Sequence, residues 1–191
     1  MKNLFLLICC LTLALFAVSV AQAGQESKEV IQARAMGTST QLGHVVTVTI
    51  HIYEYSTQED QQALVEAFKE GKSEGLFNAL TKMPSVGRIA ITGTLGYDVK
   101  YAREIPGPNG RKIRLITDRA VRFGETWRDT RSSDYNLTLV ELDVNNEKKE
   151  TTGTLIPAAM FTVDQEKQVA TIEAYKNPWK LVDIKIEKKD K

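Results

Sequence analysis

Arginine and aromatic side chains alternate with acids in one segment of the chain, residues 117–136, whose pattern fits neither a helix nor a strand. Guanidinium groups bind planar anions such as carboxylates through paired hydrogen bonds, and aromatic rings can stack on sugar faces. Long irregular segments carry binding residues more often than the elements they join. The segment therefore predicts a site for a small anionic or sugar-like ligand, with these candidate binding residues: Arg119, Arg122, Trp127, Arg128, Arg131 and Tyr135.

The same segment also permits a structural interpretation. Its arginines are matched in number by acids, which are Asp118, Glu125, Asp129 and Asp134. Ion pairs between two neighbouring strands would produce the same composition, and structural ion pairs are commoner than ligand sites. The sequence leaves both interpretations open, a ligand site and an internal network of salt bridges.

Groups suited to catalysis or metal binding are scarce elsewhere in the chain. His44 and His51 are seven residues apart, so a continuous strand places them on opposite faces, where they cannot share a metal ion. We predict no metal site and no cofactor, and the catalytic residues stay unassigned. The alternative hypothesis is an enzyme, a metal-independent hydrolase or isomerase that uses a carboxylate such as Glu125 or Asp129 with an arginine inside a barrel.

The first 23 residues indicate export. Lys2 precedes an apolar run, Leu4–Val20, which small residues at Ala21-Gln22-Ala23 follow, and this is the pattern of a secretory signal peptide. We expect cleavage after Ala23 and a periplasmic or secreted location. A membrane becomes involved only if the segment is retained as an anchor. Removing residues 1–23 from the 191 leaves 168, which is enough for one domain.

The composition of the expected mature chain excludes several classes of function. Both cysteines, Cys9 and Cys10, lie in the signal segment, so no disulfide, catalytic thiol or thiolate metal site remains. The chain has 25 basic and 24 acidic residues, and Lys2 leaves with the signal segment, so 24 charges of each sign balance. Nucleic-acid binding needs a basic excess. The expected partner is therefore a small-molecule ligand or an envelope protein, and no nucleic acid.

The mature sequence begins with an arm and a strand. Residues 24–43 are polar and low in large apolar side chains, which predicts a flexible N-terminal arm. In Val45–Tyr55, β-branched residues alternate with polar ones, which predicts a half-buried strand. We expect the folded domain to cover residues 44–188 and a charged tail to occupy residues 189–191.

Two short helices are predicted after this strand. Ser56 and Glu59 form a capping box that starts the first helix, and Gly71 ends it. The second helix starts at Ser73, and Pro84 stops it. Each helix carries apolar side chains on one face, so we expect the pair to pack on one face of the sheet or to plug one end of it.

About seven strands follow from Val86 onward. Tyr97–Ile105 and Arg111–Thr117 flank a turn at Pro106–Gly110, which predicts a hairpin, and Pro157 predicts a bulge or an edge strand. Consecutive strands joined by short turns pair antiparallel, and a long antiparallel sheet tends to close because open edges invite aggregation. We expect an α+β fold, a curled or barrel-like antiparallel sheet of about seven to eight strands with the helical pair inserted after the first strand.

Two stretches resemble an uncharacterised group of small exported bacterial proteins of unknown function. They are Gly93-Thr94-Leu95-Gly96-Tyr97-Asp98 with Tyr101-Ala102-Arg103, and Arg131-Ser132-Ser133-Asp134-Tyr135-Asn136. The resemblance implies an extracytoplasmic location and brings no activity, cofactor or catalytic residue. The leading hypothesis is thus an exported, non-enzymatic domain that binds a small ligand or an envelope protein. A structural or assembly protein is the third hypothesis.

Overall fold

The structure, a computed structural model, describes residues 26–121, 135–146, 151–164, 169–175 and 177–189. The expected signal segment lies outside these ranges. The elements, in chain order, are β1 (Glu29–Met36), the short 3-10 helix η1 (Ser39–Gln41), β2 (Val45–Ile52), α2 (Gln58–Lys82), β3 (Gly87–Ile91), β4 (Tyr97–Gly107), β5 (Gly110–Thr117), β6 (Leu137–Asn145), β7 (Thr152–Asp164), β8 (Val169–Ala174) and β9 (Trp179–Lys188).

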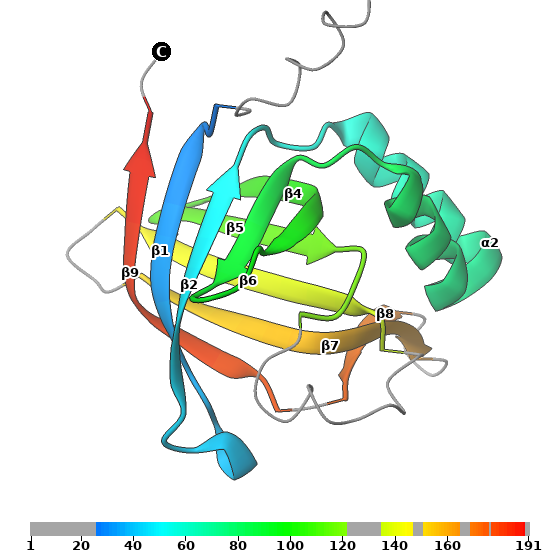
Figure 1. Cartoon of the computed structure of the whole chain (residues 1–191). Helices are drawn as coiled ribbons and strands as arrows, with labels where there is room; N and C mark the ends of the chain where they lie inside the picture. The colour runs from blue at the N-terminus through cyan, green and yellow to red at the C-terminus, as the bar shows by residue number, and fades with distance from the viewer. Residues whose placement is uncertain (1–25, 122–134, 147–150, 165–168, 176, 190–191) are drawn as a thin grey trace, which may run out of the picture.

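The strands close into an antiparallel barrel (Figure 1). Hydrogen-bonded neighbours follow the order β6-β5-β4-β3-β2-β1-β9-β7, and the pairing of β6 with β7 closes this ring of eight strands. β8 pairs with the far half of β7 and extends the sheet beyond the ring. The structure confirms the predicted α+β fold with a barrel-like antiparallel sheet.

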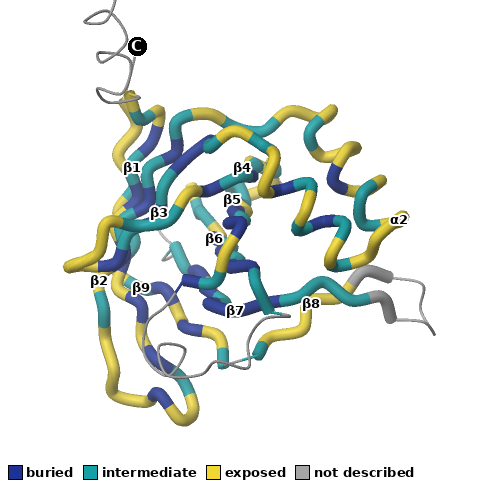
Figure 2. The backbone as a smooth tube through the Cα atoms, turned by 45° about the vertical axis from the view of Figure 1, so that its right-hand side comes forward, coloured by how far each residue is buried: buried dark blue, intermediate teal, exposed yellow. Residues whose placement is uncertain are grey.

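Apolar side chains fill the barrel interior. Buried residues recur at every second position of the strands, as the alternating pattern predicts, and Figure 2 shows them in dark blue. In β2 the buried positions are Val48, Ile50 and Ile52, while the intervening threonines and His51 are less buried. Trp179 and Leu181 of β9 complete the same core.

The expected N-terminal arm, residues 24–43, is wrong for residues 29–36, which form strand β1. β1 pairs with β2 on one side and β9 on the other, so it lies inside the ring of strands. Its inward positions include Ile31, Ala33 and Ala35, which are buried. Two of these side chains are small, and the sequence pattern therefore lacked the large apolar residues that identify a buried strand.

The predicted pair of helices is one helical element in the structure. The backbone of α2 is interrupted at Lys72, which has φ 51° and ψ −138°, near the expected boundary between Gly71 and Ser73. A Cβ atom at Gly75 would lie 2.3 Å from the carbonyl oxygen of Ala67, so the chain after the break folds back against the chain before it. Only glycine fits this close approach.

The N-terminal cap of α2 is one residue later than predicted. Thr57 accepts a hydrogen bond from the amide of Asp60 at 3.2 Å, and the Asp60 carboxylate accepts one from the amide of Thr57 at 2.8 Å. Ser56 instead bonds to Ala102 on β4, through its amide at 2.7 Å and its hydroxyl at 3.0 Å. Because Ser56 is bonded to the sheet, Thr57 and Asp60 form the capping box in place of Ser56 and Glu59.

A second apolar cluster attaches α2 to the outer face of the barrel. It joins three helix leucines to outward-facing residues of β4 and β6, namely Leu64, Leu76, Leu80, Tyr101 and Leu137. No helix in the described ranges combines the length and the apolar character needed to cross a membrane.

Two local predictions, a hairpin between β4 and β5 and a bulge at Pro157, are confirmed. β4 and β5 form the expected hairpin, with Gly107 opposite Gly110. The register between β6 and β7 shifts between Leu137 and Leu139, where Pro157 lies on the opposite strand, so the proline marks a bulge. This bulge lies beside the ends of the segment predicted to bind a ligand.

Candidate functional site

Four polar side chains form an inner charge cluster at one end of the barrel interior: Glu29, Tyr55, Glu104 and Arg111. Arg111 on β5 donates from Nη1 and Nη2 to the two carboxylate oxygens of Glu29 on β1, at 2.9 and 2.7 Å. Its Nη1 also lies 3.0 Å from Oε2 of Glu104 and 3.3 Å from the hydroxyl of Tyr55. The side chains of Glu29 and Arg111 are 4% and 9% exposed, so the pair is buried.

The protein itself satisfies the charges of the inner charge cluster. The hydrogen bond to Glu29 raises the pKa of the Arg111 guanidinium, which stays charged. Burial, and next the Glu29 carboxylate, raise the pKa of the Tyr55 phenol, which keeps its proton at neutral pH. Both carboxylate oxygens of Glu29 accept hydrogen bonds from Arg111. We interpret this cluster as a clamp that holds β1 and β5 together across the interior.

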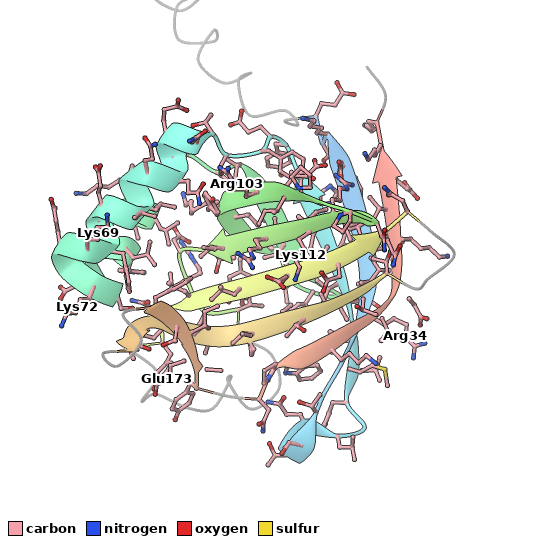
Figure 3. All side chains as sticks on the ribbon, turned by 180° about the vertical axis from the view of Figure 1, so that it is seen from behind. Arg34, Lys69, Lys72, Arg103, Lys112 and Glu173 are labelled. Carbon is pink, nitrogen blue, oxygen red and sulfur yellow. The ribbon has the colours of Figure 1, made fainter. Side chains whose placement is uncertain are left out.

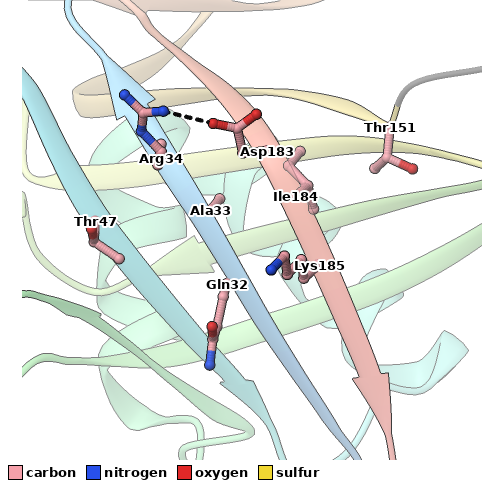
Figure 4. A pocket seen from close by; sticks show the side chains of 8 residues that line it. All are labelled: Gln32, Ala33, Arg34, Thr47, Thr151, Asp183, Ile184 and Lys185. Carbon is pink, nitrogen blue, oxygen red and sulfur yellow. Dashed lines mark hydrogen bonds and ion pairs between the residues drawn. The ribbon is translucent and has the colours of Figure 1, made fainter.

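A second polar site, here called the bulge depression, lies on the outside of the barrel between β1 and β9 (Figure 4). Its volume is about 700 Å³. The β1–β9 register shifts between Gln32 and Arg34, and Asp183 on β9 has a left-handed backbone with φ 52°. Such bulges re-aim side chains and often lie next to functional sites, as strained residues do.

The bulge depression presents two cations, one anion and several neutral polar groups. Arg34 donates from Nη1 to Oδ2 of Asp183 at 2.9 Å, and the two side chains are 54% and 55% exposed. Lys185 supplies the second cation, and the neutral groups come from Gln32, Thr47 and Thr151. Figure 3 shows Arg34 on the opposite side of the molecule from the α2 residues Lys69 and Lys72.

The structure describes two of the six predicted binding residues. Nε of Arg119 lies 3.3 Å from Oδ1 of Asp118, its neighbour in the chain, so this ion pair is local and does not link two strands. The hydroxyl of Tyr135 donates to Glu173 at 2.6 Å, and its ring centroid lies 5.2 Å from that of Tyr175. Arg122, Trp127, Arg128 and Arg131 lie outside the described residues, as do Glu125 and Asp129. The predicted site in this segment stays a prediction.

A buried threonine connects the two ends of that segment. Thr138 accepts a hydrogen bond from the amide of Val121 at 2.7 Å, and its hydroxyl donates to the carbonyl of Pro157 at 2.9 Å. Its own amide donates to the hydroxyl of Thr117 at 3.0 Å. These bonds explain how the barrel fixes the start and the end of the segment next to each other.

The histidines contribute little to either polar site. Nδ1 of His51 lies 3.0 Å from the Ser27 hydroxyl, and His44 is exposed in the β1–β2 connection. Within the described ranges, no three His, Cys, Asp or Glu side chains are arranged to hold a metal ion.

Sequence reasoning missed both polar sites, although each leaves a signal. Glu29 and Arg111 occupy inward positions of alternating strands, in phase with Ile31 and Ile113, and a charge at such a position indicates a buried pair. In β9 the alternation slips by one residue between the buried Leu181 and the half-buried Ile184. That slip is the sign of the bulge around Asp183.

The chain was compared with protein families, curated sequences and solved structures. No family model, no curated protein and no solved structure matches it. The functional interpretation therefore depends on the geometry of the two polar sites.

Proposed function

We propose that this chain is an exported, non-enzymatic domain that binds a small anionic or sugar-like ligand in the bulge depression. One observation carries the proposal. The register shift and the left-handed Asp183 open a depression of about 700 Å³ that presents Arg34 and Lys185 beside neutral hydrogen-bonding groups. Binding pockets for small molecules are typically about 300–1,000 Å³ in volume.

The charges of the bulge depression suit an anion. Only Nη1 of Arg34 is bonded to Asp183, and no other described side chain takes the donors on its Nε and Nη2. A carboxylate or sulfate group could therefore bind these donors and Lys185 together. The hydroxyls of Thr47 and Thr151 and the amide of Gln32 could bind sugar hydroxyls in the same way.

The filled interior supports a ligand site on the outer surface. The described core residues pack together inside the barrel, and the polar group at its end is the inner charge cluster, whose carboxylate and guanidinium are already paired. A ligand at the inner charge cluster would have to displace a bidentate buried ion pair, whereas the exposed Arg34–Asp183 pair can open at little cost.

The location follows from the sequence. The signal-like first 23 residues support export, and a cysteine-free domain can work in an oxidising compartment without forming disulfides. We therefore propose that the ligand is met outside the cytoplasm.

A matched pair of arginine variants tests the ligand site. The probes are sulfate, succinate, glucose and N-acetylglucosamine, each titrated by calorimetry against the wild type, Arg34→Ala and Arg114→Ala. Both arginines are 54% exposed and paired with a carboxylate on a neighbouring strand, but only Arg34 lines the bulge depression. We expect Arg34→Ala to weaken binding of the preferred probe about tenfold, the loss typical of one charged hydrogen bond. Binding of no probe, or equal loss in both variants, would refute the proposal.

A further inference from the structure

The second half of β9 has one edge without a strand partner in the described part of the chain. On one side β9 pairs with β1 as far as Lys188. On the other side it pairs with β7 only from Trp179 to Leu181. From Asp183 onward, no described strand pairs with this second edge, so its backbone can accept a further strand.

The side chains along this edge have an apolar face and a charged face. Ile184 and Ile186 are half-buried and pack against the barrel core. Asp183, Lys185 and Glu187 point outward and are exposed. A strand added at the edge would cover the two isoleucines from the side and place its own charges next to those of β9.

Charges on an edge strand usually prevent association, but here their order is self-complementary. Asp183, Lys185, Glu187 and Lys189, which directly follows β9, alternate in sign. Asp183 pairs with Arg34 at 2.9 Å and Lys189 lies 3.6 Å from Glu26, and both pairs are exposed and can exchange partners at little cost. If two copies pair antiparallel with Ile186 opposite Ile186, Asp183 faces Lys189 and Lys185 faces Glu187. Each of these pairs occurs twice because the arrangement is two-fold symmetric.

The same charges exclude the neighbouring registers. With Lys185 opposite Lys185, Asp183 would face Glu187. With Glu187 opposite Glu187, Lys185 would face Lys189. Both registers put like charges directly opposite each other, which destabilises strand pairing. Registers centred on Ile184 or on Lys188 form only two attractive pairs among these four residues, so the charge order favours the register centred on Ile186, which forms four.

We propose that two copies of this chain associate through the free edge of β9, antiparallel and centred on Ile186, to form one continuous sheet across the dimer. The interface adds cross-strand backbone hydrogen bonds, buries Ile186 against its counterpart and forms the four outward charge pairs. It does not depend on the proposed ligand, although Lys185 borders both sites.

Charge reversal at two positions tests the interface. The protein is purified in the form that the cell accumulates, and its mass in solution is measured by sedimentation as a function of concentration. Wild type is expected to dimerise. Lys185→Glu and Glu187→Lys should each raise the dissociation constant at least about tenfold, because each turns two attractive pairs into repulsive ones.

The combinations of these variants make the test specific. An equimolar mixture of Lys185→Glu and Glu187→Lys should form a heterodimer, and the double variant Lys185→Glu/Glu187→Lys should dimerise like the wild type. Lys180→Glu is the matched control, since this exposed residue lies where β7 already pairs with β9, and it should not change the dissociation constant. Arg34→Ala should also leave the dimer intact.

Three results would overturn the proposal. They are a monomeric wild type at every concentration, a dimer that both single reversals leave unchanged, and a mixture of the two single variants that stays monomeric. Circular dichroism and urea unfolding of each variant would show that the fold is retained, as expected for exposed side chains.

Discussion

Strand β1 carries two arginine–carboxylate pairs that differ in their surroundings. Glu29 points into the barrel and binds Arg111 with both oxygens, while Arg34, five residues later, points outward and binds Asp183 with one nitrogen. The inner pair is less than a tenth exposed, and the outer pair is more than half exposed. One strand thus carries one arginine–carboxylate pair in the core and a second such pair in solvent.

The difference in burial separates stability from binding. A buried charge that loses its partner keeps its full desolvation cost, so the inner pair must remain intact for the barrel to be stable. An exposed pair contributes little to stability, because water replaces either partner readily. Only the outer pair can therefore exchange its internal bond for a bond to a ligand.

Removing the inner arginine should have the largest effect. Arg111→Ala leaves Glu29 buried with only the exposed Lys188 ammonium, 4.0 Å away, as a counter-charge. We expect the free energy of unfolding to fall by about 3–5 kcal/mol. Urea unfolding followed by circular dichroism measures it. The double variant Glu29→Leu/Arg111→Met, which removes both charges, should cost much less than Arg111→Ala. If Arg111→Ala costs no more than Arg34→Ala, the inner pair is not a clamp.

The bulge should tolerate glycine but not a β-branched residue at position 183. Asp183→Val places a branched side chain at φ 52°, and we expect a loss of about 1–2 kcal/mol in unfolding free energy. Asp183→Gly removes the same ion pair without backbone strain and should stay within about 0.5 kcal/mol of the wild type. Equal unfolding free energies for the two variants would show that position 183 is not left-handed.

Alkaline pH should weaken the inner charge cluster through Tyr55. Its pKa is raised in the folded state above the ordinary 10.0, chiefly by burial. Above about pH 10 the unfolded chain therefore loses this proton first, and the free energy of unfolding falls as the pH rises.

Tyr55→Phe removes that contribution. We expect the loss of stability between about pH 9 and about pH 11 to be about 0.5–1 kcal/mol smaller in this variant than in the wild type. Urea unfolding at both pH values measures it. If Tyr55→Phe loses as much stability over this pH range as the wild type, the group whose titration lowers the stability is not Tyr55.

The outer arginine should have the smallest effect on stability. Arg34→Ala breaks one exposed ion pair, and we expect the free energy of unfolding to change by less than about 0.5 kcal/mol. The same variant is expected to bind the preferred probe about tenfold more weakly, so binding should change while stability does not. A large loss of stability would mean that the Arg34–Asp183 pair stabilises the fold as the Glu29–Arg111 pair does. The proposed difference between the two pairs would then be contradicted.

The strands were predictable where large apolar residues alternate, as in β2, and the turn at Pro106–Gly110 set the β4–β5 hairpin. Strand β1 was not predictable, because two of its inward positions, Ala33 and Ala35, carry small side chains. The stretch therefore lacks the large apolar residues that distinguish a buried strand from a polar arm. The backbone break at Lys72 lies near the predicted boundary at Gly71, whereas the close approach of Gly75 to the backbone of Ala67 is a tertiary contact that the sequence pattern does not reveal.

The bulge depression was less predictable than the fold. Arg34 and Asp183 are 149 residues apart, and only the pairing of β1 with β9 brings them together. The sequence instead directed attention to residues 117–136, where arginines are dense along the chain. Local density identified Arg119, which pairs with its neighbour Asp118, whereas a site formed between distant strands leaves no such cluster.

An amide chemical-shift titration of the wild type with the four probes tests the account most directly. We predict saturable shifts concentrated at Gln32, Arg34, Thr47 and residues 183–185, with the inner charge cluster unaffected. In Arg34→Ala the same shifts should need about tenfold more probe. Saturable shifts confined to Arg119 and Tyr135 at the ends of the arginine-rich segment, or no saturable shift with any probe, would contradict the assignment of ligand binding to the outer pair of β1.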